Sequence, residues 1–193
     1  MKSCIVTRSQ SKRSSSAFGK EIANGSFGAI HECLHNPTHV VIKRSTFETS
    51  RRDIPVHVLR EFVYLNIVQG HTNLIQFIEY DLASRTYSMV RCTTSLFHYM
   101  QDRPTFKEGN MKDALHQIAS GIQFMHRRHV IHRDLSANNV LLRVGHAHIR
   151  YIIADLGSAM YAIHGRCMTY DVTTLPFRAP EMFYGDMFYS KPV

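Results

Sequence analysis

Hydrophobic residues in the second half of the chain recur at helical spacing. Between residues 110 and 127 the apolar positions follow one another at steps of three or four: Met111, Leu115, Ile118, Ile122 and Met125. Such a stripe forms one face of an α-helix, and it must be buried against another element. A second helical pattern starts at Pro55, a residue suited to a first helical turn, and stops at Gly70.

The first half of the chain consists of short apolar runs separated by turn sequences. They predict one strand that ends near residue 22 and further strands at 27–34, 39–43, 74–80 and 87–92, with NGSFG and HNPT as turns. Later runs at 140–143 and 149–153 predict a strand pair, and the remainder is expected to be mostly irregular. Strands first and helices later predict an α+β fold with two lobes.

Length and composition are those of a folded protein. With 193 residues and 44% hydrophobic content, the chain can bury a sizeable core. No apolar run is long enough to span a membrane, and the N-terminus lacks the apolar centre of a secretory signal. Residues 1–15 are rich in serine, basic and free of acids, which predicts a mobile tail or, as the alternative, an organelle transit segment.

Cysteine, histidine and charge narrow the function classes. The four cysteines are widely and irregularly spaced, which favours a reducing compartment, the cytoplasm or the nucleus. The thirteen histidines do not combine with cysteines or carboxylates at the spacing of a zinc site. A net charge of +8 suits an anionic partner, but the basic residues are dispersed, which does not favour nucleic-acid binding as the main function.

Two segments of the strand-rich half carry residues suited to phosphate binding. IANGSFGAI, residues 22–30, places Gly25 and Gly28 in a turn where backbone N–H groups can approach phosphate oxygens, although an ordinary hairpin has the same pattern. In VVIK, Lys43 ends an apolar run, where a lone cation is costly unless a carboxylate such as Glu61 pairs with it. The alternative is that Lys43 reaches solvent at the end of its strand.

Three segments of the second half add acids and amides in loops. HRDLSANNV, residues 132–140, contains Asp134 and Asn139, and IIADLG places Asp155 after an apolar run, a good position for an acid that holds a metal ion. TTLPFRAPEMF contains the triplet APE at 179–181. Each segment alone is unremarkable, but all five in this order and at these separations match the signature set of protein kinases.

On these motifs the sequence resembles a eukaryotic-type protein kinase over about residues 16–193. IPVHVLRE, residues 54–61, is similar to the PSTAIRE helix of cyclin-dependent kinases, and VTTLPFRAPE is similar to the end of their activation segment. The resemblance implies a cyclin-dependent-kinase-like serine/threonine kinase with a strand-rich lobe at 16–92 and part of a helical lobe at 93–193. It also implies proline-directed protein substrates and a cyclin-like activator on the helix from Pro55 to Glu61.

The resemblance further implies ATP and Mg²⁺ as cofactors. Lys43, held by Glu61, would bind the α- and β-phosphates, while Asp155 and Asn139 would hold magnesium. The remaining nucleotide positions correspond to glycines and apolar residues of this chain: Ile22, Gly25, Gly28, Ile30, Leu141 and Ala154. For each apolar member of that set, taken alone, core packing is the alternative.

Substrate and regulatory roles follow in the same way. The resemblance implies that Asp134 accepts or orients the proton of the substrate hydroxyl. It also implies that Thr174 contacts Asp134, which favours serine and threonine over tyrosine as the phosphorylated residue. It places an activating phosphate on Thr169, paired with Arg60 and Arg133. A third arginine usual in the family is replaced by Met160, so we expect a weaker phosphate site.

Two departures from the family pattern affect the expected activity. Ser136 stands where serine/threonine kinases place a lysine that contacts the transferred phosphate, and its loss would cost about 1.5 to 3 kcal/mol of transition-state stabilisation. The sequence stops at YSKPV, where family members continue into a helix that packs on the stripe at 111–125. We therefore expect a truncated kinase that is poorly stable alone.

Three function classes remain open from the sequence. The leading one is ATP-dependent phosphorylation of serine or threonine in proteins. The second is a catalytically weak or inactive kinase-like module that binds ATP or a cyclin-like partner. The third is a basic nucleic-acid-binding protein, which the dispersed charge favours least.

Overall fold

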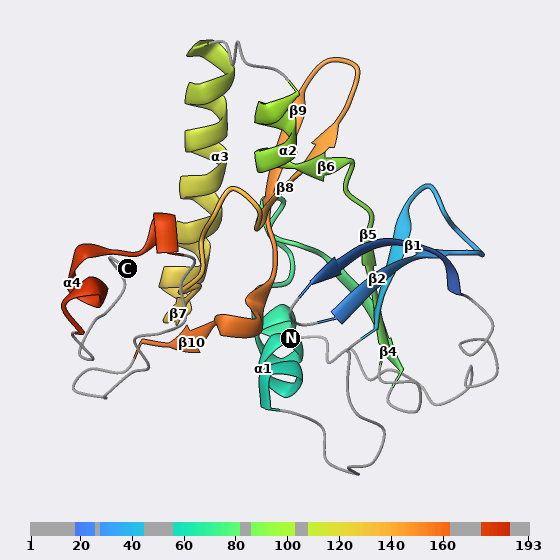
Figure 1. Cartoon of the computed structure of the whole chain (residues 1–193), viewed down its shortest axis with the longest axis horizontal. Helices are drawn as coiled ribbons and strands as arrows, with labels where there is room; N and C mark the ends of the chain where they lie inside the picture. Colours follow the sequence, from blue (N-terminus) through green and yellow to red (C-terminus); the bar gives the residue numbers. More distant parts are fainter. Residues whose placement is uncertain are drawn as a thin grey trace.

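The computed structural model describes residues 18–25, 28–44, 56–81, 86–102, 108–162 and 175–185. The predicted tail at 1–15, together with Pro55, Thr169 and Thr174, lies outside these residues. The described part has the α+β architecture expected from the sequence, with an antiparallel sheet built by the first half and the long helix by the second (Figure 1).

A five-stranded antiparallel sheet forms the first half, in the order β1-β2-β3-β5-β4. Its strands are β1 (Phe18–Gly25), β2 (Gly28–Cys33), β3 (Val40–Arg44), β4 (Phe77–Asp81) and β5 (Thr86–Val90). The alternation and turn sequences therefore located all five strands. The predicted strand at 74–80 is wrong at its start, because residues 74–75 pair with another part of the chain.

Helix α1 (Val56–Ile67) crosses beside this sheet and packs against η1 (Leu156–Ser158), a single 3-10 turn. Its inward face carries Val58 and Leu65, which are 2% and 1% exposed. Apolar residues at a further helical spacing are exposed: Val56, Leu59 and Val63. The helix is thus apolar on its core side and also on part of its solvent side.

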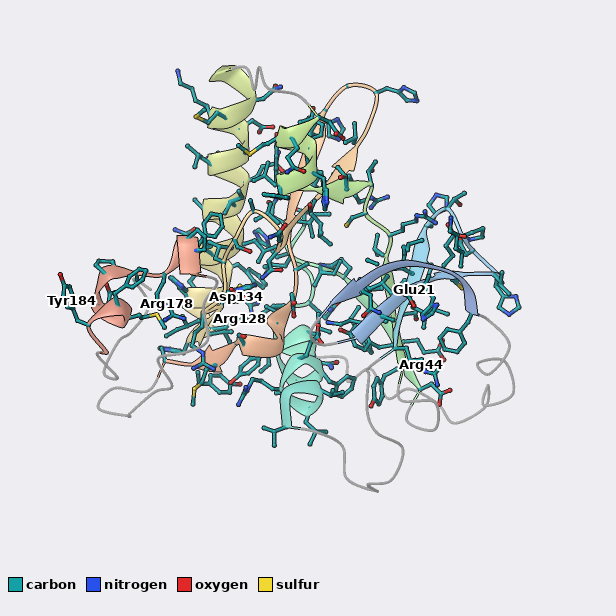
Figure 2. All side chains as sticks on the ribbon, in the orientation of Figure 1. Glu21, Arg44, Arg128, Asp134, Arg178 and Tyr184 are labelled. Atoms are coloured by element: carbon teal, nitrogen blue, oxygen red, sulfur yellow. The ribbon has the colours of Figure 1, made fainter. Side chains whose placement is uncertain are left out.

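Helix α3 (Glu108–Arg127) is the predicted long helix, and its apolar stripe is only partly buried. Met125 is 1% exposed, whereas Met111 and Leu115 are 48% and 62% exposed. The stripe is therefore buried toward the end of the helix and exposed toward its start. Other large side chains are exposed near the last described residues, including Tyr184 at 91%, which lies at the outer edge of the molecule (Figure 2).

Short elements complete the second half. Strands β8 (Val140–Val144) and β9 (Ile149–Ile153) form the predicted pair, and β6 (Thr94–Ser95) joins them. The sequence did not predict several two- to six-residue elements: α2 (Leu96–Gln101), β7 (Val130–Ile131), β10 (Met160–Tyr161), η2 (Leu175–Phe177) and α4 (Pro180–Phe183). The region after 153 is therefore less irregular than expected, since β10 pairs with β7 and α4 follows the APE triplet.

Residues 73–75 connect the two halves through a parallel bridge to β9. The Ile75 N–H donates to the Ile153 carbonyl and the Ile153 N–H to the Asn73 carbonyl, both at 2.9 Å. One continuous cluster of buried side chains, including Leu65, Leu74 and Met125, extends from α1 through this bridge to α3. None of the helices in the described ranges has both the length and the apolar character needed to cross a membrane.

Candidate active site

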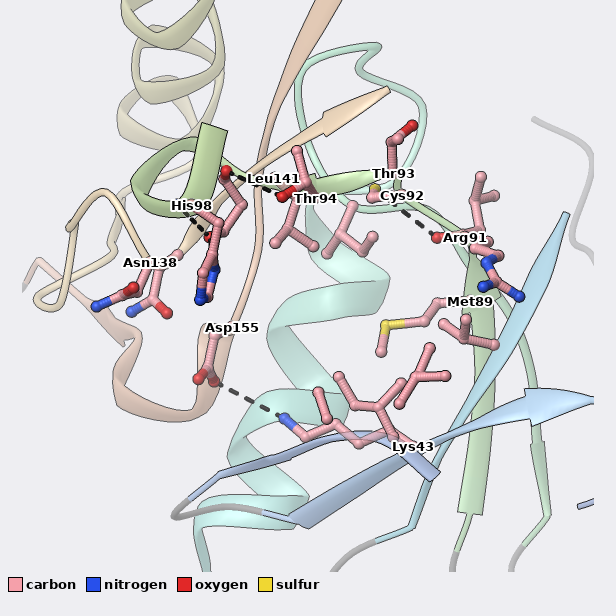
Figure 3. Close-up of a pocket in the computed structure, with 18 of the residues that line it drawn as sticks. Lys43, Met89, Arg91, Cys92, Thr93, Thr94, His98, Asn138, Leu141 and Asp155 are labelled. Atoms are coloured by element: carbon pink, nitrogen blue, oxygen red, sulfur yellow. Dashed lines mark hydrogen bonds and ion pairs between the residues drawn. The ribbon is translucent and has the colours of Figure 1, made fainter. Parts of the chain in front are cut away.

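A cavity of about 750 Å³ lies between the five-stranded sheet and the β8 strand with the loop that precedes it (Figure 3). Of the residues singled out in the sequence, nine line it: Ile22, Gly28, Ile30, Lys43, Asp134, Ser136, Asn139, Leu141 and Asp155. These residues lie far apart in the sequence and come together only in the fold. Ala154 is not among the lining residues, because it is 7% exposed and packs in the core cluster behind them.

The β1-β2 hairpin forms one wall of the cavity. Its register ends in the pair Gly25↔Gly28, and Gly28 has φ 143°, a backbone conformation that favours glycine. Ile22 and Ile30 line the cavity from this hairpin. The sequence left an ordinary hairpin and a phosphate-covering turn as alternatives, and the segment is a hairpin that faces the cavity.

Lys43 and Glu61 form a buried ion pair, as predicted. The Lys43 Nζ donates to both carboxylate oxygens of Glu61, at 2.7 and 2.9 Å, and the two residues are 6% and 3% exposed. Burial lowers the pKa of Lys43, but the charges of Glu61 and Asp155 outweigh burial, so the net shift is upward. Lys43 is therefore a fixed cation at the cavity wall, and the alternative of a solvated strand end does not apply.

Asp155 reaches the same lysine from the opposite wall. Its Oδ1 lies 3.9 Å from the Lys43 Nζ, and its side chain is 30% exposed (Figure 3). The residue has φ 61° and ψ 79°, a left-handed conformation in which its carboxylate accepts from the Gly157 N–H at 3.3 Å. The turn thus directs a partly exposed carboxylate into the cavity.

The loop before β8 holds Asp134 through hydrogen bonds to its neighbours. The Asn139 Nδ2 donates to the Asp134 carbonyl at 2.8 Å and to its Oδ2 at 3.1 Å. His132 supports this loop from below, where its Nε2 donates to the Ala154 carbonyl and its Nδ1 accepts from the Asp134 N–H. Burial lowers the pKa of His132, which fits this neutral tautomer.

The back of the cavity is formed by residues 89–95, which the sequence did not assign. Met89 is 7% exposed, pairs with Val41 across the sheet and points toward the cavity (Figure 3). Cys92 lines the cavity after it, and burial raises the pKa of its thiol to about 11. The pairing of β5 with β3 places Met89 opposite Val41, and both residues line the cavity.

Arg91 anchors this stretch to the sheet. Its guanidinium lies 3.0 Å from a Glu32 carboxylate oxygen and also donates to the Pro37 carbonyl, while its backbone N–H donates to the His39 carbonyl at 2.7 Å. Both members of the ion pair are about one-third exposed. The arginine therefore ties residues 89–91 to the β2-β3 turn.

Polar residues occupy the open side of the cavity. The Ser95 hydroxyl caps α2 by accepting from the His98 N–H at 3.3 Å, and it lies 2.8 Å from the His98 Nδ1. Ser136, singled out in the sequence, also lines the cavity and is 4% exposed. Within the described ranges its hydroxyl has no hydrogen-bond partner, and as a serine it supplies no positive charge at the position where the family pattern has a lysine.

The two arginines predicted to hold a phosphate contact backbone carbonyls. The Arg133 Nε donates to the Ser158 carbonyl at 2.7 Å, and the Arg60 Nη1 donates to the Gly157 carbonyl at 3.5 Å. Both side chains therefore converge on the turn that follows Asp155. Thr169 lies outside the described residues, so the phosphate site stays a prediction.

The donor set of the cavity fits a magnesium ion. The Asp155 carboxylate is partly exposed there, and the amide nitrogen of Asn139 is committed to Asp134, which leaves its amide oxygen for a metal. Oxygen atoms from a carboxylate and an amide suit this hard cation, which commonly shares its shell with substrate phosphates. In the described segments no three histidine, cysteine or acidic side chains form a further metal site.

Comparison with known proteins agrees with this geometry. The family model of the protein kinase domain matches residues 16–193. The chain is 31% identical over 172 residues to cyclin-dependent kinase 10 of Rattus norvegicus, covering 85% of this chain and 47% of that protein. It is also 31% identical over 183 residues to cyclin-dependent kinase 11.1 of Caenorhabditis elegans, covering 89% and 25%. The chain thus spans half or less of the length of these relatives.

Proposed function

Because this chain belongs to the protein kinase family, we propose that the protein transfers the γ-phosphoryl group of ATP to serine or threonine hydroxyls of protein substrates. One observation carries the proposal. Lys43, which Glu61 holds from behind, lines the same cavity as Asp155, Asn139 and Asp134, and this cavity also has apolar walls. A phosphoryl transfer site needs this combination of a fixed cation, metal-binding oxygens and a positioned acid.

Different walls of the cavity would contact different parts of the nucleotide. Ile30 and Leu141 provide apolar surface for a base, and residues 89–92 close the far end. Lys43, fixed by Glu61, holds a positive charge where the phosphates of the nucleotide would lie. Because the charge is already oriented, no side chain has to reorganise when the nucleotide enters.

Transfer requires an acceptor hydroxyl and a metal. Asp134, oriented by Asn139, would accept the hydroxyl proton as the acceptor oxygen bonds to the γ-phosphorus and the bond from that phosphorus to the departing ADP breaks. Asp155 and Asn139 would hold Mg²⁺, which when bound neutralises phosphate charge. We propose serine and threonine followed by proline as the phosphorylated sites. This proposal is supported by the names of the cyclin-dependent relatives, the resemblance at Thr174 and the PSTAIRE-like segment.

The test is transfer of labelled phosphate from Mg-ATP to protein substrates. We expect incorporation into serine or threonine that is abolished in Asp155→Ala, and peptides with proline after the serine should exceed those with alanine there. The matched control is Asp113→Ala, which removes an exposed acid on α3 far from the cavity lining. Transfer by wild type no greater than by Asp155→Ala would refute the proposal.

A second candidate function, partner binding by α1, rests on its exposed apolar stripe. Val56, Leu59 and Val63 are 69%, 46% and 46% exposed, and they fall on one stripe of a helix similar to the PSTAIRE helix. The partner proposed is a cyclin-like protein, by analogy with the names of the relatives. Leu59→Glu should abolish capture of a cyclin by the chain, while Val144→Glu, at an exposed valine of β8, should not.

A further inference from the structure

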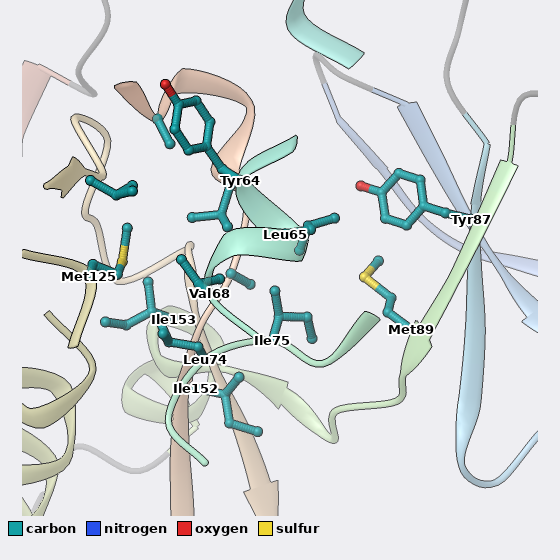
Figure 4. Close-up of a cluster of buried hydrophobic side chains, with 14 of the residues drawn as sticks. Tyr64, Leu65, Val68, Leu74, Ile75, Tyr87, Met89, Met125, Ile152 and Ile153 are labelled. Carbon is teal, nitrogen blue, oxygen red and sulfur yellow. The ribbon is translucent and has the colours of Figure 1, made fainter. Parts of the chain in front are cut away.

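Tyr64 lies one helical turn after Glu61 on α1 and reaches across to β10. Its hydroxyl oxygen accepts a hydrogen bond from the Tyr161 backbone N–H at 2.9 Å. The residue is 7% exposed, and its hydroxyl points away from Leu65 and Val68 toward the segment after η1 (Figure 4). A polar contact therefore joins the helix that carries Glu61 to a strand that begins five residues after Asp155.

The surroundings of Tyr64 fix this contact. Its ring meets the Tyr161 ring edge-on, with centroids 5.4 Å apart and planes at 64°. Burial raises the pKa of the Tyr64 hydroxyl, an effect that Arg60 and Arg133 partly oppose. The hydroxyl is therefore neutral at physiological pH and keeps its accepting lone pair.

The far side of β10 leads to the loop that holds Asp134. Met160 and Tyr161 pair with Ile131 and Val130 of β7, and the Ala162 N–H donates to the His129 carbonyl at 2.7 Å. Strand β7 continues directly into the HRD segment at 132–134. The Tyr64 hydroxyl thus links helix α1, which carries Glu61, through β10 and β7 to the predicted catalytic loop.

A second hydrogen bond between α1 and this region, made by Arg60, is longer. The Arg60 Nη1 lies 3.5 Å from the Gly157 carbonyl, at the limit of a hydrogen bond, whereas the Tyr64 contact has an ordinary length. Removal of the Tyr64 hydroxyl would leave the Tyr161 N–H without this acceptor. Among the described residues, the contact between the Tyr64 and Tyr161 rings would then remain to join α1 to β10.

We propose that Tyr64 is a positioning residue for phosphoryl transfer, whose hydroxyl fixes α1 on β10 and keeps Glu61 in register with Asp134 and Asp155. The inference rests on the function proposed above. Tyr64 acts through Glu61 and the catalytic loop, because it does not itself line the cavity. The expected effect of its loss is on kcat rather than on the KM for ATP.

The test compares Tyr64→Phe, which keeps the ring, with Tyr151→Phe. Tyr151 is 0% exposed, and among the described residues its hydroxyl has no hydrogen-bond partner, so it controls for loss of a buried hydroxyl. We expect Tyr64→Phe to lower kcat about tenfold with KM for Mg-ATP within about twofold. Amide exchange at Tyr161 should rise about tenfold while exchange at Ile42 in β3 stays unchanged. Tyr151→Phe should change none of these.

Three results would overturn the proposal. The first is an unchanged rate of amide exchange at Tyr161 in Tyr64→Phe. The second is an equal increase in the exchange rate at Tyr161 and Ile42, because that indicates general destabilisation. The third is an unchanged kcat. If the wild type transfers no phosphate, the proposed function fails separately. The position of Glu61 is then measured by the rate at which an adenosine sulfonyl fluoride modifies its partner Lys43. A change in this rate in Tyr64→Phe, with amide exchange faster at Tyr161 but not at Ile42, supports the positioning role. An unchanged rate refutes it.

Discussion

Replacing Glu61 by glutamine removes the charge that holds Lys43 without changing the size of the side chain. Lys43 would remain 6% exposed, with the Asp155 carboxylate at 3.9 Å left as its negatively charged partner. At the 2.7 Å separation of the native pair, the attraction is about 6 kcal/mol for an effective dielectric constant of about 20. Desolvation of both ions offsets most of that gain, so the net value of the intact pair is small.

The loss of one partner is nevertheless expensive, because the buried ammonium stays. We expect Glu61→Gln to lower the free energy of unfolding by about 3 kcal/mol. The double variant Lys43→Met with Glu61→Leu removes both charges and should recover most of that loss. A matched control is Glu32→Gln, which breaks a pair of similar length that is about one-third exposed and should cost no more than about 1 kcal/mol.

Urea denaturation of the four proteins measures these differences, with the same slope required for all of them. A Glu61→Gln protein within about 0.5 kcal/mol of the parent would show that Lys43 reaches water in solution. A double variant less stable than Glu61→Gln would show that the pair stabilises the fold outright. Either result would refute the account of Lys43 as a buried cation that depends on its carboxylate.

Three further predictions follow from the same site. Ser136→Lys should raise kcat about tenfold to a hundredfold in the transfer assay, because it restores a cation beside the phosphates, and an unchanged kcat would contradict this. Cys92, whose thiol pKa burial raises to about 11, should be alkylated by iodoacetamide at pH 8 about a hundredfold more slowly than free cysteine, as peptide mass spectrometry can measure. Burial lowers the pKa of His132 in the folded state below the ordinary value of 6.5, so the unfolded chain takes up a proton first as the pH falls. The contribution of neutral His132 to the free energy of unfolding is therefore complete above about pH 6.5 and is lost as the pH falls below that value. The urea midpoint should therefore drop between pH 7 and pH 5, and a midpoint that rises on acidification would contradict this.

The parts of the fold found from sequence are those with enough length for a period to show. The stripe at 110–127 located α3, whose observed bounds are Glu108–Arg127, and the run beginning at Pro55 located α1. Strands β7 and β10 have two residues each, which is too short for a hydrophobic alternation to show in the sequence. They form because each strand provides the hydrogen-bonding partner of the other. Leu74 appeared to begin a strand because it is apolar, but its bridge partner is Ile153.

The same reasoning separates the site residues that were predicted from those that were not. Lys43, Glu61 and Asp155 are charged residues in or beside apolar runs, which signals a partner even without a structure. Tyr64 gave no such signal, because a tyrosine on an amphipathic helix is an ordinary core residue and its backbone partner lies 97 residues away. Met89 and Cys92 were missed for a different reason, since only strand register shows which of several neighbouring apolar residues faces the cavity.

The anchoring of Arg91 also shows where, along residues 89–95, the chain passes from the sheet to the β8 side. Everything through Arg91 is fastened to the β2-β3 turn, whereas the Thr93 N–H donates to the Leu142 carbonyl at 2.6 Å and so belongs to the β8 side. Between β5 and β6, Cys92 alone lies between these two attachments, and it also lines the cavity. A thiol reagent or ligand seated against its side chain would therefore contact the one residue that separates the sheet side of the cavity from the β8 side.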